Sequence, residues 1–151
     1  MSRNNRSFWL AAAIGLLLDQ LTKVLVMRGM TLQQTIPLWQ GVFHLTYVTN
    51  TGAAFSLFSQ QGVGLKWVSL LATVGLVVLG LRAQGLHPWE KVGFGLILAG
   101  AAGNGIDRFL YGYVIDFLDF RLIRFPVFNI ADVCINLGLI CLLIYLWQQR
   151  R

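Results

Sequence analysis

The feature that most limits the fold of this chain is a series of four long apolar stretches, at residues 8–26, 67–82, 92–110 and 131–147. Each approaches the roughly 20 residues with which an α-helix crosses a hydrocarbon core about 30 Å thick. The 151 residues are 56% hydrophobic and only 12% charged, against a charged fraction of roughly 25% in soluble domains. We therefore predict an all-α membrane protein, in which residues 1–151 form one domain built on a four-transmembrane-helix bundle.

The first apolar stretch follows Arg3 and Arg6, as the core of a secretory signal peptide would. However, Asp19 and Lys23 interrupt it, and no A-x-A-like cleavage site comes after it. We expect a retained membrane span.

The net charge of +6 is best explained by membrane topology and by contact with anionic lipid, and we expect no nucleic acid partner. Basic residues are dense in the two tails and in the short loop at 83–91, whereas those on the other side are spread over two long loops. Because short segments dominate the positive-inside rule, this distribution predicts that both termini are cytoplasmic.

The two long loops carry patterns typical of strands. Residues 42–48 (VFHLTYV) are rich in β-branched and aromatic side chains, and the turn-prone TNTG follows at 49–52. Residues 113–123 (YVIDFLDFRLI) suit either a strand or an interfacial segment. A small extracytoplasmic β-sheet is therefore expected beside the bundle.

Carboxylates are the most informative side chains of the chain. Of its six acidic residues, five lie at or near predicted span ends on the external side: Asp19, Asp107, Asp116, Asp119 and Asp132. An ionisable group at membrane depth costs about 2.5–3.5 kcal/mol on insertion scales, so each needs a reason to be there. Two explanations stay open for Asp132, which either belongs to a helix start capped by Asn129 or takes part in chemistry.

Small and polar residues surround these acids. Gly95, Ala99 and Gly103 recur at the four-residue spacing that lets membrane helices approach closely, which would bring Asn104 and Arg108 against neighbouring helices. If the chain returns after Asp116, that carboxylate can meet Asp132. Two adjacent carboxyl groups share one proton, as an aspartic protease requires.

Simpler roles are weighed for the other polar residues. Asn50 can shape the TNTG turn, and Lys23 can extend its ammonium to the membrane interface. Arg108 can pair with Asp107 or Asp19.

His44 and His87 show no metal-ligand spacing, so we expect no metal.

Two functions other than a protease are considered. A small ion- or proton-coupled membrane transporter is the alternative function, although the acids gather on one side and no repeat is visible. A non-catalytic membrane anchor would leave the cluster of Asn and Asp residues without a role.

Five motifs occur in order along the chain: DQLTK (19–23), TNTGAAFS (49–56), GAAGNGIDR (100–108), YVIDF (113–117) and FNIAD (128–132). Together, among four spans, they resemble the bacterial lipoprotein signal peptidases, also called signal peptidase II. The resemblance extends over nearly the whole chain.

This resemblance implies an aspartic endopeptidase of the bacterial inner membrane, with its active site near the extracytoplasmic face. Its substrates are lipid-modified prolipoproteins, cut on the N-terminal side of a diacylglyceryl-bearing cysteine. By motif position, Asp116 and Asp132 correspond to the catalytic dyad, and Asp119 does not. The supporting polar positions are Asp19, Lys23, Asn50, Asn104, Arg108 and Asn129. No cofactor is implied, membrane lipids are further partners, and a monomer is expected.

Overall fold

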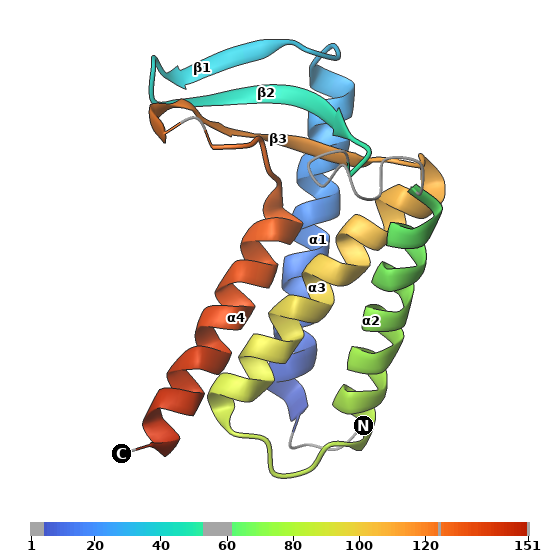
Figure 1. Ribbon diagram of the computed structural model, residues 1–151, viewed down its shortest axis with the longest axis vertical. Coiled ribbons are helices and arrows are strands. Elements are labelled where there is room, and N and C mark those ends of the chain that lie inside the picture. Colours follow the sequence, from blue (N-terminus) through green and yellow to red (C-terminus); the bar gives the residue numbers. More distant parts are fainter. Residues whose placement is uncertain (1–4, 53–61, 124, 151) are drawn as a thin grey trace.

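The computed structural model describes residues 5–52, 62–123 and 125–150, and it contains a helical bundle with a small sheet at one end (Figure 1). The helices are α1 (Arg6–Gly29), α2 (Gly62–Arg82), α3 (Pro88–Leu110) and α4 (Ile130–Gln149). Each predicted apolar stretch lies within one of these helices.

Three helices in the described part of the chain are long and apolar enough to cross a membrane: α1, α4 and residues Gly64–Arg82 of α2. Three of the four predicted spans are therefore candidate membrane spans by their length and apolar composition. Helix α3 carries glycines throughout and Asn104, Asp107 and Arg108 near its end, which lower its mean hydropathy. Its crossing of the membrane stays a prediction.

Helix α3 occupies the centre of the bundle, where it packs against α1, α2 and α4 (Figure 1). Its glycines make these contacts possible, because a Cβ atom on Gly95 would overlap the Phe8 carbonyl of α1. A Cβ atom on Gly100 would overlap the Ala131 carbonyl of α4. The close approach predicted from small residues is confirmed. The surface of α3 that packs against its neighbours carries small side chains, where a lipid-facing helix would carry bulky ones.

The sheet lies at the end of the bundle opposite the start of α1 and the end of α4 (Figure 1). Its order is β1 (Thr35–Trp39), β2 (Phe43–Asn50) and β3 (Val114–Phe120), with both pairings antiparallel. The strand expected at 42–48 is confirmed as β2, and the 113–123 segment forms β3 and the short 3₁₀-helix η3 (Arg121–Ile123). Strand β1 was not predicted, because it is an edge strand in which Pro37 interrupts the pattern typical of strands.

Strand β3 also holds the segment that leads into α4. The backbone N–H groups of Phe117 and Leu118 donate to the Phe128 carbonyl over 3.0 and 2.8 Å. The Phe128 N–H in turn donates to the Leu118 carbonyl over 3.0 Å. These bonds bring the start of α4 against the strand that carries Asp116.

Candidate active site

Lys23 lies at the centre of a buried charged cluster between α1 and α3. Its Nζ atom is 2.9 Å from Asp19 Oδ2 and 2.8 Å from Asp107 Oδ2, and it donates to Asn104 Oδ1 over 3.1 Å. The side chain is 1% exposed, so the expectation that it extends to the membrane interface was wrong. Three acceptors satisfy the three donors of the ammonium group, and this compensates for its burial.

Arg108 does not have the partners expected for it. Both Asp19 and Asp107 are bound to Lys23, while Arg108 Nη1 donates to Ser69 Oγ over 3.1 Å and to the Asn104 carbonyl over 3.4 Å. Lys23 reaches both carboxylates because it extends from α1 towards α3, one turn after Asp19. Arg108 instead connects α3 to α2.

The two acids of this cluster fix neighbouring elements. Asp19 Oδ1 accepts the backbone N–H of Ala131, in the first turn of α4, over 2.8 Å. Asp107 Oδ2 accepts the backbone N–H of Ile115, in β3, over 3.1 Å. The cluster therefore sets the positions of the two elements that carry the predicted catalytic acids.

Gln20 also belongs to this cluster, although its role was not predicted from the sequence. Its Nε2 atom donates to Asp19 Oδ2 over 3.1 Å, and to the Gly103 carbonyl and Asp107 Oδ1 over 3.3 Å each. An uncharged polar residue beside Asp19 within an apolar stretch was the available signal.

Asn129 caps α4 and contacts both predicted catalytic residues. Its Oδ1 atom accepts the Asp132 N–H over 3.0 Å, and its own N–H donates to Asp132 Oδ2 over 3.2 Å, which is a reciprocal capping box. Its Nδ2 atom donates to Asp116 Oδ1 over 2.7 Å and to Asn104 Oδ1 over 3.0 Å. The cap predicted for Asn129 is confirmed, and the same side chain joins Asp116 to the start of α4.

Asp116 and Asp132 each receive another amide. Asn50 Nδ2 donates to Asp116 Oδ2 over 2.9 Å, and Asn104 Nδ2 donates to Asp132 Oδ1 over 2.9 Å. Asn50 also accepts the Gly52 N–H over 2.8 Å, so its predicted turn role and its contact with an acid coexist. Residues 53–56 of the TNTGAAFS motif lie outside the described residues.

The two acids differ in their surroundings. Asp116 is only 2% exposed, and this burial, to which the negative charge of Asp132 adds, raises the pKa of Asp116 to about 6. Hydrogen bonds from Asn50 and Asn129 oppose the rise. Asp132 is half-buried in the first turn of α4, where the helix dipole favours a negative charge.

Asp132 opens onto a hollow of about 740 Å³. The hollow lies between residues 125–128 and the first two turns of α4, where Val133, Asn136 and Leu137 complete the wall. Asp119, which the sequence analysis set apart, instead accepts hydrogen bonds from Thr46 and Arg121 on the sheet. Within the described residues, no His, Cys, Asp and Glu side chains group as a metal site.

This fold, a helical bundle with acids and amides converging beneath a small sheet, is shared with known membrane enzymes. Two solved structures, each described as a bacterial membrane enzyme, share this fold. One is 29% identical with a TM-score of 0.84, over 93% of this chain and 87% of the other. The second is 30% identical with a TM-score of 0.82, over 91% and 90%.

Sequence relatives identify the family. Residues 11–148 match the family described as signal peptidase (SPase) II. A lipoprotein signal peptidase of Cyanothece sp. (strain PCC 7425) is 60% identical, over 97% of this chain and 87% of the relative. That of Gloeobacter violaceus is also 60% identical, over 95% and 83%. This chain belongs to the signal peptidase II family, and the transporter alternative finds no support among these relatives.

Proposed function

We propose that this chain is a lipoprotein signal peptidase of the aspartic type, with Asp116 and Asp132 as its catalytic dyad. Its substrates are prolipoproteins, which it cuts on the N-terminal side of the lipid-bearing cysteine. The observation that carries the dyad is the position of Asn129, which donates to Asp116 from its side chain and forms a capping box with Asp132.

The two acids divide the chemistry according to their surroundings. Asp116 is the preferred holder of the shared proton because it is buried and its pKa is raised. Asp132 faces the hollow, and the dipole of α4 and the Asn104 amide stabilise its negative charge. Asp132 therefore removes a proton from the attacking water, while Asp116 donates its proton to the carbonyl oxygen of the scissile peptide.

The remaining polar residues position the dyad. Asn50 donates to one carboxylate oxygen of Asp116 and Asn129 donates to the other. Asn104 connects Asp132 to Lys23, and Asp19 fixes the first turn of α4. Arg108 braces α3 against α2 beside Asn104.

We also propose how the enzyme lies in the membrane. All four helices cross the inner membrane, both termini are cytoplasmic, and the sheet and dyad lie near the extracytoplasmic face. Substrate then enters sideways from the bilayer through the hollow beside Asp132, where water also reaches the dyad. One chain suffices for activity, since all the residues invoked come from a single copy.

Cleavage by purified enzyme in lipid tests the dyad. Wild type is expected to cut a diacylglyceryl-modified prolipoprotein and to leave its unlipidated form intact. Asp116→Asn and Asp132→Asn keep the side-chain size but remove the titrating group, so each is expected to lower the cleavage rate by roughly 10²–10⁴-fold.

Asp119→Asn is the matched control, because Asp119 lies on the same strand as Asp116 but bonds Thr46 and Arg121. It is expected to keep near-wild-type cleavage. If both dyad variants cleave at the wild-type rate, the proposed mechanism is wrong. If wild type does not cleave the lipidated prolipoprotein, the proposed substrate is wrong.

A further inference from the structure

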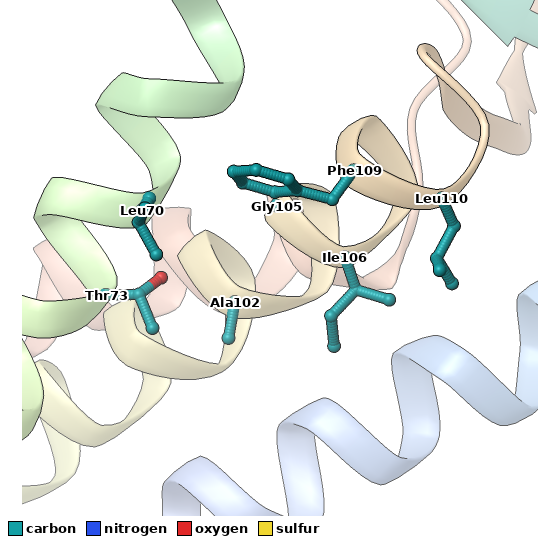
Figure 2. A pocket seen from close by; sticks show the side chains of 7 residues that line it. All are labelled: Leu70, Thr73, Ala102, Gly105, Ile106, Phe109 and Leu110. Carbon is teal, nitrogen blue, oxygen red and sulfur yellow. The ribbon is translucent and has the colours of Figure 1, made fainter.

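A second hollow lies on the far side of α3 from the dyad. A cavity of about 370 Å³ opens between α2 and α3, and Figure 2 shows Leu70 and Thr73 of α2 facing Ala102, Ile106 and Phe109 of α3. A neighbouring cavity of about 320 Å³ shares Thr73 and Ala102 and extends to α1. We refer to these two neighbouring hollows together as the α1–α2 groove.

The α1–α2 groove is separate from the catalytic cluster. Asn104 lies two residues from both Ala102 and Ile106, so at 3.6 residues per turn it projects from the opposite side of α3. The acids of the dyad do not line either cavity. Any ligand of this groove is therefore distinct from a peptide held at Asp116 and Asp132.

The walls of the groove are apolar. Alanines and a glycine form its small lining residues, and the larger ones, apart from Thr73, are aliphatic or aromatic. The hydroxyl of Thr73 donates to the Ser69 carbonyl over 2.7 Å, so its hydrogen is already used within α2. Such walls favour a hydrocarbon ligand.

The end of the groove near the start of α1 is closed. There Asn5 Nδ2 donates to the carbonyls of Gly80 and Ala83 over 3.0 and 2.9 Å, which fastens α1 to α2. Phe8 and Trp9 pack against Gly80 at the same level. A partner's transmembrane helix, about 10 Å wide and long enough to cross the bilayer, needs a groove open along its whole length. A single acyl chain does not.

The end near the sheet carries a positive charge. Lys66 lies one turn before Leu70 on α2, and its Nζ atom is 5.7 Å from the ring centre of Phe109, a groove residue. Trp67 packs edge-on against the same ring, with ring centres 5.8 Å apart. Tryptophan and lysine in this arrangement are typical of the headgroup layer.

We propose that the α1–α2 groove binds an anionic phospholipid from the leaflet at the sheet end. One acyl chain lies along Leu70, Ala102 and Ile106, and the phosphate lies at Lys66. The charge at the mouth distinguishes this ligand from the diacylglyceryl group of a prolipoprotein, which carries no phosphate.

Mass spectrometry of the intact protein released from detergent tests the proposal, with phosphatidylglycerol and the zwitterionic phosphatidylcholine as probes. Wild type is expected to retain one phosphatidylglycerol, preferred over phosphatidylcholine by about fivefold from one lysine near the headgroup. Lys66→Gln is expected to abolish the preference. Arg82→Gln, at the other end of α2, is the matched control and is expected to keep it.

Steric variants test the position of the acyl chain. Thr73→Leu and Ala102→Leu narrow the groove from opposite walls, so both are expected to lose bound lipid of either kind. Gly75→Leu adds the same side chain where the space is open, and is expected to retain lipid. Melting temperatures identify any variant that fails to fold. If one of the two steric variants fails to fold, the other is sufficient for the test.

Three results would overturn the proposal. They are equal retention of the two lipids by wild type, a lipid preference unchanged by Lys66→Gln, and full retention in a folded steric variant. Loss of a protein dimer in the steric variants, in place of loss of lipid, would assign the groove to a second copy of the chain.

Discussion

At the scale of single residues, Lys23 and Asp116 show two ways of keeping an ionisable group buried. Lys23 is charged and has three acceptors, two of them carboxylates. Asp116 accepts hydrogen bonds from two amides, and its burial raises its pKa. The first group stabilises the fold, and the second is left able to carry a proton near neutral pH.

Lys23→Met is expected to destabilise the protein strongly, because it leaves Asp19 and Asp107 buried without a cation. Removing one partner from a buried ion pair costs about 3–5 kcal/mol. Arg28→Met, an exposed position on the same helix, is the control and is expected to change little. Thermal unfolding in detergent measures both, and equal melting temperatures would contradict the stabilising role of Lys23.

Asp116 is expected to give stability a measurable pH dependence. In the unfolded chain its carboxyl ionises near 3.8, whereas in the folded protein its pKa is about 6. The protonated Asp116 carboxyl therefore makes its full contribution to the stability of the folded protein at low pH. This contribution is lost as the pH rises through about 6. Asp116→Asn does not titrate, so its melting temperature relative to wild type should rise between about pH 4 and 7. A constant difference would show that burial does not raise the pKa.

At the scale of elements, the start of α4 combines a structural cap with site geometry. Asn129→Ser keeps a good capping residue but loses the amide that reaches Asp116. Asn129→Ala loses both, at a further cost of about 1 kcal/mol. We expect Asn129→Ser to have a higher melting temperature than Asn129→Ala, and both variants to lose cleavage activity. Wild-type cleavage by the Ser variant would show that the Asn129–Asp116 bond is dispensable.

The contact between α3 and α4 depends on glycine. Gly100→Ala places a Cβ atom against the Ala131 carbonyl and Ile135, so the helices must separate and the melting temperature should fall. Gly75→Ala, in α2, meets no atom within 4 Å and should be neutral or slightly stabilising, because alanine favours helix. Similar melting temperatures for the two variants would mean that α3 and α4 tolerate a wider spacing.

Elements differ in how far the sequence predicts them. The helices follow from runs of apolar residues, and β2 follows from β-branched and aromatic residues, both of which are local properties. Strand β1 lacks that pattern because Pro37 interrupts it, and the strand exists because it pairs with β2, where Thr35 lies opposite Thr46 and Ile36 opposite Leu45.

At the scale of the whole molecule, the bundle has a sheet end and an opposite end, at which α1 starts and α4 finishes (Figure 1). The proposed topology predicts that Gln84→Cys, in the loop between α2 and α3, is labelled only from the cytoplasm. Leu38→Cys, exposed on β1, should be labelled only from outside. Impermeant maleimides applied to intact cells and to inverted vesicles measure this, with little background because Cys134 and Cys141 are buried. The reverse pattern would invert the proposed orientation.

The sequence by itself determined the membrane character, the four helical segments and the identity of the polar residues in the candidate site. These depend on composition within short segments, which sets where a helix can form and where a charge needs compensation. Resemblance to a family then assigned Asp116 and Asp132 to a dyad.

Only the tertiary structure decided which groups meet. In the folded chain Asp19 and Asp107 form ion pairs with Lys23 and not with Arg108. Gln20 joins the same cluster through Asp107. The pairing of β3 with Phe128 places Asn129 within hydrogen-bond distance of Asp116. The physical reason is that hydrogen bonds and ion pairs form between atoms about 3 Å apart, and contacts between residues distant in the chain depend on how helices and strands pack.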